Sequence, residues 1–168
     1  MTRPLPDEYT PFAARYVDLV PEDDLLGAMR AQQAVTRAAV LAYAGRPDFR
    51  YAPGKWSIRQ VMGHMADAEQ VFGFRALWVA RSDVSPLPGY DQDAWMAASD
   101  FSTQPLETLL NGFEAARRSN LLMLGGLDAA TWTRRGLVDD HAFSVRSLAR
   151  MLLGHERAHL DVLRERYV

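Results

Sequence analysis

The sequence predicts an all-α fold, specifically a four-helix bundle. Four long stretches carry apolar residues at helical spacing, and no segment alternates convincingly between apolar and polar residues as a strand would. About 20 residues separate the second stretch from the third, which permits a long crossover instead of a simple up-and-down succession. The chain of 168 residues is long enough to bury one core, so we expect a single domain over residues 1–168.

The N-terminal part is predicted to contain one helix. Three prolines interrupt the first twenty residues, which we expect to form an irregular lead-in. The first helix should begin at Pro21, because proline is favoured at the first helical position and the acidic residues that follow suit the positive helix end. It should run to about Tyr43 and stop at Gly45.

The second helix is predicted from Ser57, its N-cap, to about Ser82. Gln60 stands three residues after Ser57 and completes a capping-box pattern. The proline- and glycine-rich residues 86–91 that follow cannot form a helix or a regular strand. A short helix capped by Asp91 or Asp93 is then expected to run through Trp95.

The third helix is predicted over Gln104–Leu124, followed by one short turn and a loop over residues 133–143. Ser144 is the expected N-cap of the fourth helix, which runs to the end of the chain. One stripe of this helix carries Leu148, Leu152, His155, His159 and Val162.

Composition argues against several functional classes. The formal net charge is −2 and the basic residues are scattered, so we expect neither nucleic acid nor a membrane surface as a partner. The chain has no cysteine, which removes disulfides, thiolate ligands and a cysteine nucleophile. The N-terminus has no apolar signal region, and no apolar run approaches the ~20 residues of a membrane span. By elimination, we expect a cytoplasmic protein.

Three histidines form a candidate metal site. His155 and His159 are four residues apart on the apolar stripe of the fourth helix, and His64 lies beside the apolar stripe of the second. Three imidazoles with one open position are typical of a catalytic metal centre, and facing helices of bundles often supply such ligands. The alternative is that each imidazole is a hydrogen-bonded core residue. His141, in the predicted loop, is interpreted as a surface residue.

The segment from His155 to His159 also matches the H-E-x-x-H pattern, in which a glutamate activates metal-bound water. Glu156 is therefore a candidate general base, with a solvated helix charge as the alternative. Only nine residues follow His159, and Val162 and Glu165 stand where a metzincin would have glycine and histidine. A third protein ligand must therefore come from upstream, which points to His64.

The pattern resembles the DinB-like superfamily, and within it the YfiT-type branch. The resemblance is carried by residues 55–64 (KWSIRQVMGH), 86–95 (PLPGYDQDAW) and 144–167, in order and spacing. It implies an up-down-down-up bundle and a metal triad at His64, His155 and His159. It also implies one divalent ion, zinc or nickel, and either a thiol S-transferase activity with bacillithiol or mycothiol or a metal-dependent hydrolase.

Three functional hypotheses follow. The leading one is a transferase in which a low-molecular-weight thiol loses its proton at the metal and attacks a small-molecule electrophile. The second is a hydrolase in which the ion lowers the pKa of bound water toward about 7 and produces hydroxide. The third is a non-catalytic metal-binding stress-response module.

Other residues are expected around this site. Gln60, Tyr90 and Trp95 are candidates for lining the substrate pocket, with core packing or loop anchoring as their alternative role. The residues considered for orienting the imidazoles are Asp67, Glu69 and Asp161. Apolar residues such as Leu77 and Trp78 are expected to face either the core or the partner in a homodimer.

Overall fold

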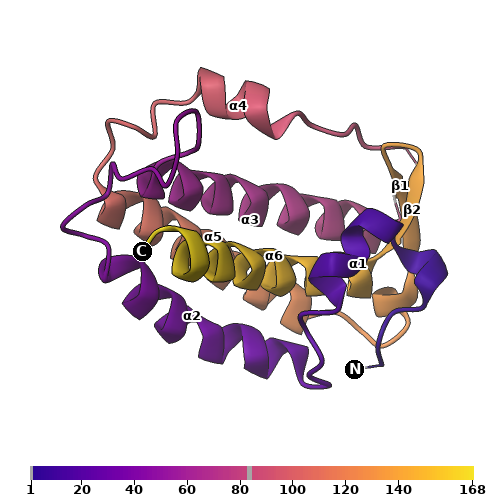
Figure 1. Cartoon of the computed structure of the whole chain (residues 1–168). Coiled ribbons are helices and arrows are strands. Elements are labelled where there is room, and N and C mark those ends of the chain that lie inside the picture. Colours follow the sequence, from indigo (N-terminus) through magenta and orange to yellow (C-terminus); the bar gives the residue numbers. More distant parts are fainter. Residues whose placement is uncertain (1, 83–84) are drawn as a thin grey trace.

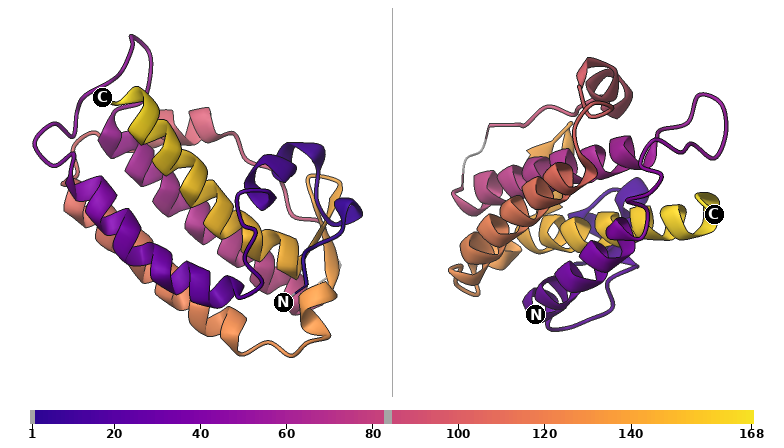
Figure 2. Two further views of the ribbon diagram at one scale, coloured as in Figure 1. Left: turned by 60° about the horizontal axis from the view of Figure 1, so that its bottom comes forward. Right: turned by 90° about the vertical axis from the view of Figure 1, so that its left-hand side faces the viewer.

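Four long helices form the body of the molecule in a computed structural model that describes residues 2–82 and 85–168. They are α2 (Leu25–Leu41), α3 (Ile58–Ala80), α5 (Leu106–Gly125) and α6 (Val145–Arg166). Helices α2 and α6 run in one direction and α3 and α5 in the other (Figures 1 and 2). Helix α3 packs against α5 and α6, and α2 packs against the same two helices. The predicted up-down-down-up four-helix bundle is confirmed.

Two of the predicted helix starts are confirmed by reciprocal hydrogen bonds. At α3, the Ser57 hydroxyl accepts from the Gln60 backbone N–H while the Gln60 side chain accepts from the Ser57 backbone N–H. At α6, Ser144 and Ser147 exchange the same pair of bonds. These caps fix where the histidine-bearing helices begin. The predicted start of the first long helix at Pro21 is wrong, because the Asp24 carboxylate caps the helix by accepting from the Gly27 backbone N–H at 2.9 Å.

The connection between α3 and α5 crosses the bundle and carries the short helix α4 (Gln92–Ala98), which Asp91 caps as predicted. In Figure 1 this connection passes along the outside of α3. After α4, the connection comes back to α3 at Phe101, whose ring packs on the backbone of Gly63. A Cβ atom on Gly63 would lie 2.3 Å from this ring. The crossover therefore stays close to the histidine of α3.

The expectation that the first twenty residues form an irregular lead-in is wrong. They contain the 3₁₀ turn η1 (Pro6–Glu8) and helix α1 (Pro11–Val17), with Thr10 as N-cap and Pro11 at the first helical position. Helix α1 packs against α6 so closely that a Cβ on Gly154 would lie 2.0 Å from a backbone oxygen of α1. The segment is ordered by contacts distant in sequence, which local propensity does not reveal.

The predicted loop over residues 133–143 is also wrong. After the 3₁₀ turn η2 (Thr131–Thr133), strands β1 (Arg135–Val138) and β2 (His141–Ser144) form an antiparallel hairpin in which Val138 pairs with His141. The two residues between the strands, Asp139 and Asp140, have φ angles of 51° and 60°. Positive φ at both central residues is the conformation of a type I′ turn, whose twist matches that of the two strands. Aspartate tolerates positive φ better than most residues.

The core consists of two apolar clusters. One lies between α1, α3, α6 and the hairpin, and the other lies between α3, α5 and the C-terminal end of α6. Among the described residues, none of the helices combines the length and apolar character needed to cross a bilayer.

Candidate metal centre

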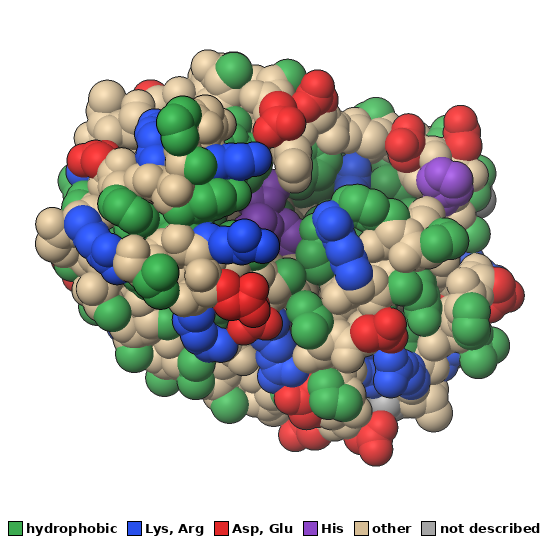
Figure 3. Space-filling view, in the orientation of Figure 1, with side chains coloured by type: hydrophobic (Ala, Val, Ile, Leu, Met, Phe, Trp, Pro, Cys, Tyr) green, Lys and Arg blue, Asp and Glu red, His purple; other side chains and the backbone are tan. Residues whose placement is uncertain are grey.

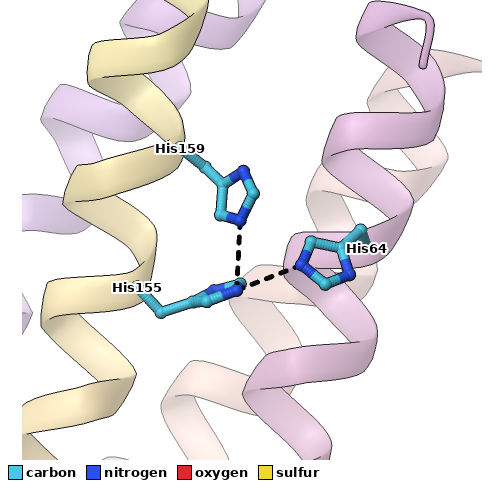
Figure 4. Close-up of side chains that lie close together, drawn as sticks. All are labelled: His64, His155 and His159. Atoms are coloured by element: carbon cyan, nitrogen blue, oxygen red, sulfur yellow. Dashed lines mark hydrogen bonds between the residues drawn. The ribbon is translucent and has the colours of Figure 1, made fainter. Parts of the chain in front are cut away.

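The three predicted metal ligands converge on one point between α3 and α6. The Nε2 atom of His155 lies 3.1 Å from Nε2 of His64 and 3.1 Å from Nε2 of His159 (Figure 4). One ligand atom from each of the three rings lies within 4.8 Å of the others. His64 and His155 are buried and His159 is half-buried. Residues 91 apart in sequence are thus brought into one donor set.

The donor chemistry fits a divalent cation better than a hydrogen-bonded cluster. An imidazole Nε2 carries either one hydrogen or one lone pair, so Nε2 of His155 cannot make two full hydrogen bonds to two neighbouring nitrogens. A cation accepts one lone pair from each ring. Nitrogens at ~2.0–2.1 Å from a tetrahedral zinc ion lie about 3.4 Å apart, close to the separations that this site shows.

Burial keeps the three imidazoles neutral, which is the form that binds metal. Desolvation lowers the pKa of His64 to about 4, although the negative charge of Asp93 acts in the opposite direction and raises it. Desolvation and the neighbouring His64 and Arg15 lower the pKa of His159 to about 3. The pKa of His155 is also lowered, chiefly by its burial. At neutral pH the triad therefore offers three lone pairs.

Aromatic rings, not carboxylates, surround the imidazoles. The ring of His155 meets the edge of Tyr16 at 5.3 Å and that of Phe72 at 5.5 Å between centroids, while Trp56 lies 5.0 Å from His64. Among the described residues, no carboxylate accepts a hydrogen bond from these three rings. The imidazoles are therefore oriented mainly by packing.

The carboxylates considered for that orienting role lie elsewhere. Glu69 binds Arg117, and Asp161 pairs with the exposed Arg164. Asp67 is half-buried, and burial raises its pKa, but it makes no hydrogen bond to a ring of the triad.

Glu156, the candidate general base, points away from the triad into the bundle core. One oxygen accepts from the hydroxyl of Thr36 on α2, and the other accepts from Arg117 on α5 at 2.7 Å. Arg117 is fully buried and also binds Glu69, at 2.8 Å. Both oxygens of Glu156 are thus already used, so its role as a general base stays a prediction that this geometry does not favour.

A cavity of about 430 Å³ opens beside His155. Helix α1 contributes Phe12 and Tyr16, α3 contributes Phe72 and Arg75, and the crossover contributes Tyr90. The hairpin closes the remaining side. Figure 3 shows histidine side chains at the floor of a hollow flanked by apolar and basic side chains. The metal centre is therefore accessible to a small molecule.

A second cavity of about 490 Å³ lies beside His159, toward the C-terminal end of α6. It is lined by Trp56, Lys55 and Asp93, among others. Gln92, the first residue of α4, lines both cavities. The triad thus lies between two cavities that adjoin at Gln92.

The three predicted pocket residues have different positions. Tyr90 lines the cavity beside His155. Gln60 does not line either cavity, because its side chain caps α3. Trp95 is 46% exposed and does not line either cavity. Its ring packs at a tilt against that of Tyr90, with 4.8 Å between the centroids.

The sequence did not identify Tyr16 or Arg75 as cavity residues. Tyr16 was missed because its helix was not predicted. An arginine in the middle of the apolar second helix was a signal that could have drawn attention to Arg75.

Comparison with known proteins now places this geometry in a family. A family model for the DinB superfamily matches residues 23–163, which include all three histidines and both helices that carry them. The chain belongs to the DinB superfamily. Helix α1, which forms one wall of the cavity, precedes the part of this DinB-superfamily chain that the model matches.

Two relatives are similar to this DinB-superfamily protein. A protein of Oceanobacillus iheyensis named "Putative metal-dependent hydrolase" is 31% identical over 113 residues, which are 66% of this chain and 64% of that protein. The match thus spans somewhat less than two thirds of the relative's length. The structure of YfiT from Bacillus subtilis, described as "a probable metal-dependent hydrolase with an unusual four-helix bundle topology", aligns with a TM-score of 0.76. It shares 20% identity and covers 85% of this chain and 83% of YfiT, which shows a common fold.

Proposed function

We propose that this protein is a divalent-metal-dependent enzyme that activates a small thiol and transfers it to an electrophilic small molecule. The observation that carries the proposal is the position of the triad between two cavities, one beside His155 and one beside His159. Two approaches to one metal centre suit two substrates. A hydrolase, whose nucleophile is water, needs only one such cavity.

The residues of the chain have distinct tasks in this proposal. His64, His155 and His159 would hold the ion, and Tyr16 and Phe72 would keep bulk water from the ring of His155. A bound divalent cation supplies Lewis acidity that deprotonates a coordinated thiol at neutral pH. No protein base is then required, which agrees with the engagement of Glu156 by Thr36 and Arg117. The thiolate sulfur would form a bond to carbon as the electrophile loses its leaving group.

A metal-dependent hydrolase is the second candidate, and the names of the two similar proteins favour it. Three neutral ligands would leave the full charge of a divalent ion in place, and this charge favours ionisation of a coordinated water.

One experiment separates the candidates. Protein loaded with zinc or nickel is assayed with 1-chloro-2,4-dinitrobenzene in the presence and absence of bacillithiol, and with 4-nitrophenyl acetate alone. We expect metal-dependent formation of the dinitrophenyl thioether that disappears in the His155→Ala variant. Ester hydrolysis unaffected by thiol would support the hydrolase, and metal binding with no turnover in a broad substrate screen would favour a non-catalytic module.

A further inference from the structure

The cavity beside His155 combines apolar walls with one buried cation. More than half of its lining residues are aromatic or aliphatic, among them Phe12, Tyr16, Phe72, Val138, Phe143 and Met151. Arg75 lies among them and is only 9% exposed. Burying a guanidinium costs desolvation free energy unless the group is paired. The partners of Arg75 therefore indicate whether it stabilises the fold or binds a ligand.

Arg75 forms no ion pair with a carboxylate in the described part of the chain. Its guanidinium donates one hydrogen bond to the backbone oxygen of Pro88, at 2.9 Å. Among the described residues, no aspartate or glutamate lies within ion-pair distance of it. A guanidinium carries five N–H donors in a planar fork that matches a carboxylate or phosphate group. Most of these donors therefore remain available at the cavity wall.

The contrast with Arg117 shows that this arrangement is not imposed by the bundle. Arg117, which is fully buried, is held by two carboxylates, Glu69 and Glu156. Arg75 instead lies 5.9 Å from the centre of the Phe72 ring and 5.5 Å from that of Tyr90. Burial lowers the pKa of Arg75, yet an arginine remains charged at neutral pH.

The other charged groups near the cavity leave room for an anion. Arg15 lies at its rim, with its guanidinium 3.7 Å from the centre of the Phe12 ring and donating to the Tyr16 hydroxyl at 2.6 Å. Asp139 is the acidic residue among the lining side chains, and its charge opposes the effect of burial on the pKa of Arg75. It is exposed at the hairpin turn, however, and forms no ion pair with Arg75. The triad itself contributes no negative charge, and a divalent ion would add positive charge.

We propose that the cavity beside His155 binds a small organic anion, with a carboxylate or phosphate group on Arg75 and an aromatic or aliphatic body against the ring-lined walls. This inference rests on the proposed function, because it assigns this cavity to the electrophilic second substrate. It predicts that such substrates place an anionic group at one end and the reacting carbon toward His155.

The test measures binding by calorimetry, without turnover. The probes are benzoate, phenyl phosphate and the neutral analogue benzamide, titrated into the full chain with and without zinc. Three variants are compared: Arg75→Gln, which can still donate to the Pro88 oxygen, Arg75→Lys, which keeps the charge, and Arg134→Gln. Arg134 is a matched control, because it also donates to a backbone oxygen, that of Ala80 at 2.5 Å, but does not line the cavity.

We expect at least one of the two anions to bind more tightly than benzamide, with the tighter one identifying the favoured headgroup. Arg75→Gln should weaken that binding tenfold or more, while Arg75→Lys restores part of it and Arg134→Gln has no effect. Equal affinities of wild type and Arg75→Gln, or no detectable binding of either anion to folded protein, would overturn the inference. Metal content is measured on the same samples. If the protein takes up no zinc but still binds the anion through Arg75, the proposed metal-dependent function fails. The assignment of an anion site to this cavity then still holds.

Discussion

His155 and Glu156 are adjacent in sequence but face different neighbouring helices from α6. His155 faces His64 on α3 at 3.1 Å, whereas Glu156 faces Arg117 on α5 at 2.7 Å. Successive residues of a helix point about 100° apart, so one helical step separates the metal centre from the buried ion cluster. The H-E-x-x-H pattern is thus present in sequence while its glutamate belongs to the core.

Replacing Glu156 should therefore affect stability more than metal binding. The Glu156→Gln variant weakens a buried ion pair, which costs on the order of 3 kcal/mol of unfolding free energy. Urea denaturation measures this loss, and elemental analysis should still find about one equivalent of metal. A variant of normal stability that no longer binds metal would show that Glu156 acts at the triad after all.

Each triad histidine should be needed for the metal. Because all three Nε2 atoms meet at one point, His64→Ala and His155→Ala should each reduce bound zinc or nickel from about one equivalent to near zero. His141→Ala is the matched control, since His141 lies outside the triad and is exposed. Retention of stoichiometric metal by either triad variant would refute the assignment.

The metal-free protein should lose stability as the pH falls from about 6.5 toward 4. Burial lowers the pKa of folded His64 to about 4, so the unfolded chain takes up this proton first and acid favours unfolding. The slope is about 1.4 kcal/mol per pH unit for one such imidazole. Urea midpoints measured with chelator present should show a shallower slope for His64→Gln. An identical slope for that variant would contradict the explanation.

The packing of the N-terminal segment against the rest of the molecule should depend on the ionised carboxylate of Glu8. Burial alone would raise the pKa of Glu8, but hydrogen bonds from Arg146 and Ser144 outweigh it and lower the pKa to about 2. Its stabilising contribution, about 3 kcal/mol, is complete above the unfolded pKa near 4.5 and is lost as the pH falls toward 2.

Glu8→Gln should accordingly loosen the packing of α1, so that trypsin cleaves after Arg15 at neutral pH faster than in the wild type. Asp7→Asn is the control, because Asp7 is exposed and forms only a surface ion pair with Arg135. Equal protection of α1 in the wild type and Glu8→Gln would show that Glu8 is not the anchor.

Gly154 should be required for the wall that α1 provides. A methyl group there would meet the backbone oxygen of Tyr16, which cannot move independently of its helix, so Gly154→Ala should cost about 1–3 kcal/mol. Gly112→Ala in α5 meets no atom within 4 Å and should be neutral or stabilising by about 0.5–1 kcal/mol. Thermal denaturation compares the two, and equal melting temperatures would contradict this close approach.

The sequence by itself determined the four long helices, two of their caps and the three histidines. These features follow from local rules: apolar spacing at helical period, serine before a helix, and imidazoles placed one turn apart on α6. Such signals lie within a few residues of one another, so they can be found without knowing the fold.

Only the tertiary structure decided what surrounds the histidines. Helix α1 and the hairpin are held by contacts with α6 and α3, and the cavity walls come from five separate segments. The direction of Glu156, and the bonding of Arg75 to a backbone oxygen without an ion pair among the described residues, likewise depend on which segments face each residue. Spacing along one helix fixes relative angles on its surface, but the partner across that surface is set by the packing of the whole bundle.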